Sequence, residues 1–395
     1  MRHLFSPERS SFSIWHVLGI SAAMLGAGQT LANNGVQLPG YGAQAQGMGG
    51  VSIALPQDAV ASANNPAGMA LVGNRVDFDL TVLRGPVDTT VGSRHYSDTA
   101  VILVPTGGFS RVINDDFSWG VSVFGNGVGL DYGEPVFGTK NLRSDFVQLI
   151  VAPTLTYQFR PGHYLGISPR LAIERLDIAG LEGFGYPYHG ADYAYGAGFA
   201  LGYIGEVAKG VRLGLTYASP IRFEKMDDYA QILPEGRINA PQQAGIGLSY
   251  KPVPQLTLAA DYLWIDWSSE RAYGNRLTEG GAPGSSRAPG FGWRDQHVFR
   301  AGVAYDWSER WTVRGGVSFA STLIPDSESS YATLAPLMEY DHYSLGATYR
   351  FNNGFELTGS YTLVPRGTVH GKGASAGVST SARADYLNLG ISYRY

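Results

Sequence analysis

Apolar and polar residues alternate along several stretches of this chain, and this alternation restricts the possible folds more than any other feature. At the C-terminus, Leu387, Leu389, Ile391, Tyr393 and Tyr395 fall on one face of an extended strand, and Asn388, Gly390, Ser392 and Arg394 fall on the other. The same split recurs around residues 211–217, 299–306, 343–351 and 355–363. A soluble β-sandwich is the alternative, but the small and charged residues of the second face cannot form its core. The pattern therefore predicts strands with one face toward lipid and the other toward water.

About fourteen such strands are predicted. They begin near Val76, Ala100, Trp119, Asp145, Tyr164, Ala191, Val211, Ala240, Leu256, His297, Trp311, Asp341, Phe355 and Asp385. Tyr and Trp residues at many strand ends are typical of the aromatic girdles of a membrane barrel. Short connections with turn residues alternate with longer ones, the longest at about residues 268–296. We therefore predict an all-β fold, a transmembrane antiparallel β-barrel over residues 75–395.

The composition excludes several classes of protein. Of 395 residues, 16% are charged and none is Cys, so disulfides and thiolate metal sites are ruled out. The net charge of -4 leaves no basic stripe for nucleic acid. Beyond the N-terminus there is no run of 18 apolar residues, so a membrane-spanning chain of this kind must be a barrel. The histidines are scattered and no catalytic motif is present, so we expect no catalytic site, no metal and no cofactor.

The first residues are typical of an export signal. A basic start that includes Arg9 precedes the apolar stretch from Ile14 to Leu25, and small residues lead up to Ala32. The alternative, an N-terminal membrane anchor, is disfavoured because the apolar stretch is short and interrupted by His16. We predict a signal peptide over residues 1–32. An exported chain without cysteine is consistent with the outer membrane of a Gram-negative bacterium.

Residues 33–74 show little alternation and many small side chains, and we expect them to fill the barrel lumen. They include the glycine-rich run GYGAQAQGMGG at 40–50 and the motif Asn65, Pro66, Ala67. These features resemble the plug, or hatch, of the FadL/TodX (OmpP1) family of outer-membrane transporters for long-chain fatty acids and aromatic hydrocarbons. The resemblance extends to WGVSVFGNGVGLDY at 119–132 and LAADYLWIDW at 258–267. In such a plug, Asn65 and Pro66 act as a latch; a static turn is the alternative.

The resemblance implies passive uptake of a hydrophobic molecule that leaves the barrel sideways into the bilayer. A lateral exit requires a break in the hydrogen-bond ladder, and glycines within a strand can produce one. The predicted third strand contains such a segment at Gly125, Asn126, Gly127 and Gly129, where the family has its lateral-opening kink. The alternative is that these residues mark the end of the strand and its loop.

A hydrophobic route also needs apolar side chains on the inner face of the barrel. The residues with inward parity that we assign to a substrate pocket are Phe124, Phe146, Ile150, Leu263, Ile265 and Trp267. The alternative is that they pack the plug, or that a bulge reverses their parity. Arg170 and Arg314 are candidates for contact with a substrate carboxylate. Pairing with inward acidic residues such as Asp261 or Glu356 is the alternative.

The predicted function is therefore an outer-membrane channel for hydrophobic small molecules. The predicted partners are that substrate, outer-membrane lipid and lipopolysaccharide, with the protein as a monomer. The alternative function is a general diffusion porin for small polar solutes, which would not need a plug. An enzyme is disfavoured by the missing motifs, and an adhesin by the modest loops.

Overall fold

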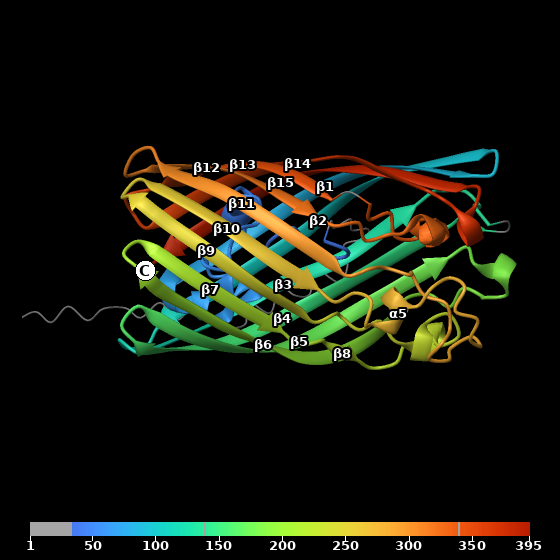
Figure 1. The fold of residues 1–395 in the computed structure, drawn as a ribbon, viewed down its shortest axis with the longest axis horizontal. Helices are drawn as coiled ribbons and strands as arrows, with labels where there is room; N and C mark the ends of the chain where they lie inside the picture. Colours follow the sequence, from blue (N-terminus) through green and yellow to red (C-terminus); the bar gives the residue numbers. More distant parts are fainter. Residues whose placement is uncertain (1–33, 138–139, 339) are drawn as a thin grey trace, which may run out of the picture.

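The computed structural model describes residues 34–137, 140–338 and 340–395, so the predicted signal peptide lies outside the described residues. The chain forms one closed antiparallel sheet, in which the first long strand pairs with the last (Figure 1). The long strands are β1 (Arg75–Val91), β2 (Arg94–Val112), β3 (Phe117–Asp131), β4 (Arg143–Arg160), β5 (His163–Ala179), β6 (Asp192–Ala208), β7 (Val211–Ala218), β9 (Gln243–Val253), β10 (Leu256–Ile265), β11 (Gln296–Asp306), β12 (Trp311–Ala320), β13 (Asp341–Arg350), β14 (Phe355–His370) and β15 (Val378–Arg394). The short β8 (Arg222–Phe223) pairs with β6. The predicted fourteen-stranded barrel is confirmed.

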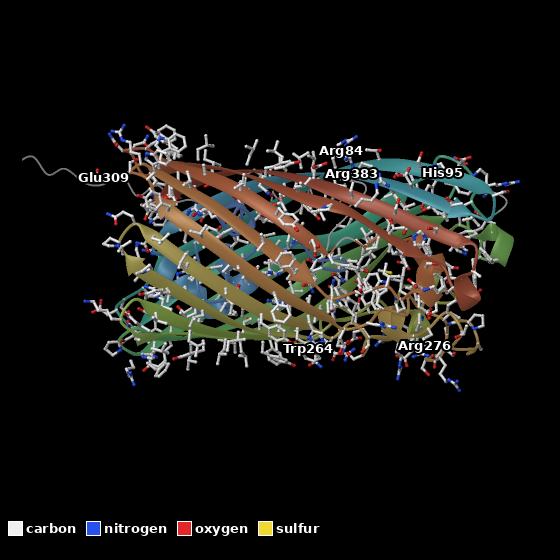
Figure 2. All side chains as sticks on the ribbon, turned by 45° about the horizontal axis from the view of Figure 1, so that its top comes forward. Arg84, His95, Trp264, Arg276, Glu309 and Arg383 are labelled. Carbon is white, nitrogen blue, oxygen red and sulfur yellow. The ribbon has the colours of Figure 1, made fainter. Side chains whose placement is uncertain are left out.

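Closure of the sheet gives each long strand a neighbour on both sides, which is the condition for strands to stand in hydrocarbon. The predicted alternation is visible in the exposure of the side chains: Leu345 and Leu389 are 70% and 52% exposed, whereas their neighbours Ser344 and Asn388 are buried. Figure 2 shows the outward side chains along the wall. Aromatic rings pair between strands near one end of the barrel, for example Trp311 with Tyr349 at 4.9 Å between ring centroids.

The two ends of the barrel differ. Short turns and the C-terminus lie at one end, the short-turn end, and the long connections lie at the other, the loop end (Figure 1). The loop end carries α5 (Arg271–Gly274), α6 (Ser329–Ala332) and the short 3-10 turns η2 (Glu182–Phe184), η3 (Asp227–Tyr229), η4 (Pro234–Gly236), η5 (Asp326–Glu328) and η6 (Gly373–Ser375). Among the described residues, no helix is both long enough and apolar enough to span a bilayer.

Two predicted strand starts were wrong. β2 begins at Arg94 rather than near Ala100, and β15 begins at Val378 rather than at Asp385. In both strands the added residues continue the pairing with β1 beyond the apolar stretch. Val91 of β1 pairs with Arg94 of β2 on one side and with Val378 of β15 on the other. Their side chains include several polar ones, so a search for apolar alternation stops too early.

Residues 34–74, here called the N-terminal segment, lie inside the barrel, where Figure 1 shows them in blue. The segment contains α2 (Ala43–Gln46), α3 (Ala61–Asn64), η1 (Pro66–Gly68) and α4 (Met69–Val72). Inward glycines of the wall make room for it. A Cβ atom added at Gly202 would lie 2.0 Å from Oδ1 of Asn65, and one at Gly214 would lie 2.3 Å from the carbonyl oxygen of Ile53. The wall and the segment are therefore closely complementary in shape.

Polar groups of the wall hold the backbone of the N-terminal segment. The carboxylate of Asp261 accepts hydrogen bonds from the backbone N–H groups of Ser52 (2.7 Å) and Ile53 (3.0 Å). The carboxylate of Asp77 accepts one from Ala59 (2.8 Å), and Arg300 donates to the carbonyl of Gly50 (3.1 Å). The segment has little regular structure of its own, so these contacts satisfy backbone groups that would otherwise be buried unpaired.

Candidate functional site

The hydrogen-bond ladder of the wall is interrupted between β2 and β3. In the described chain, β2 and β3 pair only from Val112 with Ser118 to Gly107 with Val123. The ladders on either side continue: β1 pairs with β2 as far as Arg94, and β3 pairs with β4 as far as Asp131. Residues 94–106 of β2 and 124–131 of β3 therefore face each other without forming a ladder. We call this part of the wall the β2–β3 gap.

Other groups take the place of the missing ladder in the β2–β3 gap. The backbone N–H of Gly127 donates to the carbonyl of Val36 in the N-terminal segment (2.8 Å). Toward the loop end, the carboxylate of Asp98 accepts a hydrogen bond from the N–H of Asp131 (2.9 Å). Inside the barrel, the hydroxyl of Tyr41 donates to the side chain of Asn126. The gap is thus closed from within by the N-terminal segment rather than by a neighbouring strand.

A pocket, here called the outer pocket, opens at the loop end next to the β2–β3 gap. Its empty volume, which includes open solvent at the mouth, is about 630 Å³. Barrel strands, the N-terminal segment and three long connections contribute to it. The lining residues are Val36, Val128, Ser144, Phe146, Leu176, Ile178, Ile232, Leu233, Pro234, Ile238, Ala272, Tyr273, Pro289, Gly290, Phe291, Trp293, Tyr331, Leu334 and Ala335. None of these side chains is charged, so the pocket suits an apolar ligand.

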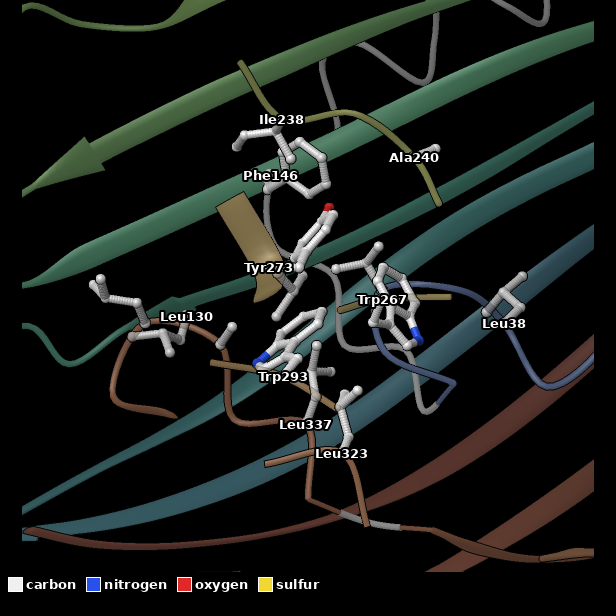
Figure 3. Close-up of a cluster of buried hydrophobic side chains, with 14 of the residues drawn as sticks. Leu38, Leu130, Phe146, Ile238, Ala240, Trp267, Tyr273, Trp293, Leu323 and Leu337 are labelled. Carbon is white, nitrogen blue, oxygen red and sulfur yellow. The ribbon is translucent and has the colours of Figure 1, made fainter. Parts of the chain in front are cut away.

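Three aromatic rings form one wall of this region, as Figure 3 shows. Tyr273 and Trp293 are stacked with 4.8 Å between centroids, and Trp267 meets each of them edge-on, at 4.9 Å and 5.2 Å. Backbone hydrogen bonds fix the arrangement, because the N–H of Trp293 donates to the carbonyl of Tyr273 (2.8 Å). The rings are therefore held by loop backbone as well as by stacking.

One continuous cluster of buried apolar residues connects the outer pocket with the β2–β3 gap. Phe146 and Tyr273 belong to it at the pocket, and Ile102 and Leu130 belong to it at the gap. Val36 lies between the two regions, since its side chain lines the pocket and its carbonyl accepts the hydrogen bond from Gly127. Val36 lies near the start of the N-terminal segment, which we call its tip. It thus separates the outer pocket from the β2–β3 gap.

The sequence-predicted substrate residues are all buried, but only Phe146 lines the outer pocket. Phe124 and Ile150 line a smaller cavity that also contains Arg170, and Leu263 lines another beside Gln37. Ile265 and Trp267 belong to the apolar cluster, where the indole of Trp267 packs against Gly35. The predicted glycines Gly125, Gly127 and Gly129, with Asn126, all fall within the gap.

Both candidate arginines contact the N-terminal segment. Arg170 donates to the carbonyl of Ala63 (3.1 Å), and its guanidinium lies 5.7 Å from the ring centre of Phe124. Arg314 lies toward the short-turn end and donates to Gln57 (2.9 Å), Gln44 (2.7 Å) and Thr348 (2.7 Å). Neither forms an ion pair with a described acidic residue. Other inward arginines do form such pairs, for example Arg75 with Asp77 and Arg350 with Glu356.

Asn65 fixes the second half of the N-terminal segment to the wall. Its side-chain amide donates to the carbonyls of Ile53 (2.8 Å), Tyr203 (3.2 Å) and Leu215 (3.2 Å), the last two on β6 and β7. Its side-chain oxygen accepts from the N–H of Ala67 (3.1 Å) and so caps η1. Pro66 occupies the first turn of η1, where a missing N–H costs nothing. The side chain of Asn65 therefore connects two strands and one turn.

The long connections bring four aromatic residues to the outer pocket that were not predicted from the sequence, namely Tyr273, Phe291, Trp293 and Tyr331. Loops have no periodicity from which the direction of a side chain can be read. One signal was present: three of these four residues stand in the connection around 268–296, whose glycine, proline and polar residues otherwise indicate a solvated loop. Large aromatic residues in such a loop suggest a buried site.

Comparison with known proteins identifies the family of this chain. The family model described as outer membrane protein transport protein (OMPP1/FadL/TodX) matches residues 23–395. The chain is similar to the long-chain fatty acid transport proteins of Salmonella typhi, with 23% identity over 70% of this chain and 73% of the relative, and of Escherichia coli, with 24% identity over 70% and 72%.

Among solved structures, the Pseudomonas putida toluene transporter TodX superposes with a TM-score of 0.72 at 17% identity, over 91% of this chain and 99% of the other. A Pseudomonas aeruginosa FadL homologue superposes with a TM-score of 0.66 at 18% identity, over 91% and 99%. These structures share the fold. Together with the match over nearly the whole sequence, they confirm the resemblance seen in the sequence: the chain belongs to the OMPP1/FadL/TodX family of outer-membrane transport proteins.

Proposed function

We propose that this protein lets hydrophobic small molecules cross the outer membrane passively, entering at the outer pocket and leaving sideways through the β2–β3 gap. The interruption of the ladder next to a continuous apolar cluster is the observation that carries this proposal. The names of the relatives, transport proteins for long-chain fatty acid and for toluene, support the substrate class. The proposal assigns the chain transport and no catalytic chemistry.

The physical reason for a sideways exit is the cost of hydrating the solute. Burial of a methylene group is worth about 0.8 kcal/mol, so delivering a twelve-carbon chain to water would cost about 10 kcal/mol. A passage from the apolar pocket into the lipid avoids this cost, because the solute stays in an apolar environment throughout. An exit at the short-turn end would instead pass a polar pocket lined by arginines such as Arg75, Arg350 and Arg394. Such a pocket is unsuitable for a hydrophobic solute.

In this proposal the plug is residues 33–74, which include the N-terminal segment, and the barrel is residues 75–395. Passage requires Val36 to move, because it lies between the outer pocket and the gap. Only one hydrogen bond from β3, that of Gly127, holds its carbonyl. The contacts of Asn65, Asp261 and Arg314 anchor the rest of the segment, so motion of the tip alone suffices. A general diffusion porin would instead need an open aqueous lumen.

The outer-membrane lipid is the expected surrounding partner, with the protein as a monomer. Arg84 and Arg383 are exposed on β1 and β15, near each other and toward the loop end in Figure 2. Val82 of β1 and Leu387 of β15 are outward apolar residues that pair with each other. Arg84 and Arg383 lie beyond this pair, on its loop-end side. Guanidinium groups at this border are suited to phosphates of lipopolysaccharide.

Native mass spectrometry of the detergent-solubilised protein tests both partner assignments. We expect a monomer that carries lipopolysaccharide, and less of it on an Arg84→Ala, Arg383→Ala variant. Equal amounts on both proteins would contradict the assigned lipid contact, and a larger assembly would contradict the monomer.

The route itself is tested by filling the β2–β3 gap. We expect Gly127→Trp to slow uptake about tenfold or more, because an indole at this position obstructs the β2–β3 gap. The matched control is Gly359→Trp on β14, where an added Cβ meets no atom within 4 Å. The measurement is the initial uptake of radiolabelled oleate and toluene by cells that lack their own transporter. Equal rates for both variants would contradict a lateral route, and faster entry of small sugars with neither compound carried would favour a porin.

The plug assignment is tested at Asn65. In Asn65→Asp the acceptor for Ala67 remains, but the donors to Ile53, Tyr203 and Leu215 are lost, which destabilises docking by about 1–3 kcal/mol. We expect protease cleavage within residues 34–74 of the folded barrel to become faster, together with altered uptake. Asn352→Asp, in an exposed turn, is the matched control. Unchanged cleavage in Asn65→Asp would show that this side chain does not hold the segment.

A further inference from the structure

The side chain of Tyr273 is the polar feature of the outer pocket that needs explanation. Its residue is 3% exposed, and its ring is fixed between Trp293 and Trp267. Stacking and edge contacts on both sides leave the ring little freedom to turn away. The direction of its hydroxyl group is therefore set by the surrounding structure.

The hydroxyl of Tyr273 points toward apolar side chains. Figure 3 shows it directed at Phe146 and Ile238, both of which line the outer pocket. It has no hydrogen-bond partner among the described residues. A buried hydroxyl without a partner destabilises the folded protein, and a ligand that brings an acceptor would remove this cost.

The hydroxyl of Tyr273 remains a hydrogen-bond donor. Burial, with a smaller effect from the nearby carboxylates of Glu174 and Glu270, raises the pKa of Tyr273 well above its ordinary value. The phenol is therefore protonated at any physiological pH. A donor in an apolar cavity favours a ligand that brings an acceptor.

The charge of such a ligand follows from the rest of the lining. The outer pocket has no basic side chain among its lining residues; Arg222 and Arg271 line a separate polar pocket that shares Pro234 and Ala272 with it. A carboxylate placed at Tyr273 would be desolvated without a counter-charge, which is costly. A neutral acceptor such as a carbonyl, ether or ester oxygen avoids this cost.

We infer that the outer pocket preferentially takes neutral aromatic molecules that carry one hydrogen-bond acceptor, with the ring against Tyr273 and Trp293 and the acceptor at the Tyr273 hydroxyl. The inference rests on the proposed function in one respect only, namely that the outer pocket is the entry site. It narrows the substrate class from hydrophobic molecules in general to ring compounds with one neutral polar group.

Isothermal titration of the purified, detergent-solubilised protein tests this inference without transport. The probes are acetophenone, which has a ring and a carbonyl; ethylbenzene, which lacks the acceptor; and benzoate, which is charged. We expect acetophenone to bind about five- to tenfold more tightly than ethylbenzene, and benzoate to bind most weakly. In Tyr273→Phe the ratio of acetophenone to ethylbenzene affinity should fall to about one, with ethylbenzene affinity kept.

The controls separate this inference from the proposed function. Tyr305→Phe, on the outward face of β11, should leave the affinity ratio unchanged. A ratio near one in the parent protein, or a preference that survives Tyr273→Phe, would overturn the inference while leaving uptake of hydrophobic molecules intact. Preference in the titration without any uptake by cells would instead contradict the proposed function and leave the binding inference standing.

Discussion

The structure depends on one constraint, the need of every backbone N–H and C=O group at membrane depth for a partner. Fourteen strands meet this constraint by closing into a barrel, with β1 paired to β15 along almost their whole lengths. Between β2 and β3 the constraint is met differently. There the N–H of Gly127 is satisfied by Val36 from inside the barrel, and the N–H of Asp131 by the side chain of Asp98. These two hydrogen bonds can be broken without disrupting the ladders in the rest of the wall.

The N-terminal segment therefore has two parts with different attachments. Its body is held by buried charged and polar side chains of the wall, among them Asp261 and Asp77, and by glycines that let its backbone approach. Its tip around Val36 is held by one hydrogen bond to β3 and by apolar packing against residues such as Trp267. Apolar packing has no fixed direction, so a hydrophobic solute can replace it at little cost. This difference in attachment is what makes a route past the tip physically reasonable.

The sequence was sufficient for the barrel, but not for the outer pocket; the glycines at 125–129, predicted as a lateral opening, lie in the β2–β3 gap. Strand alternation is local, so Leu389 and Asn388 reveal their faces without knowledge of their neighbours. The starts of β2 and β15 were placed too late, because their outermost residues are held by pairing and carry several polar side chains. The contacts of Arg170 and Arg314 could not be foreseen, since they join residues distant in sequence. Tyr273 and Trp293 come from a loop, where no periodic rule gives the direction of a side chain.

The central claim is that a hydrophobic solute leaves the barrel sideways, and photolabelling with an alkyl diazirine tests it most directly. The probe would be added to outer membranes that contain the protein, activated by light, and its sites of attachment mapped by mass spectrometry. The account predicts labels in the outer pocket and on residues 100–106 and 124–131, on either side of the β2–β3 gap. Labels in the pocket and on Thr257, Thr312 and Arg314 at the short-turn end, with none at the gap, would contradict it, because they would mark a path along the barrel axis.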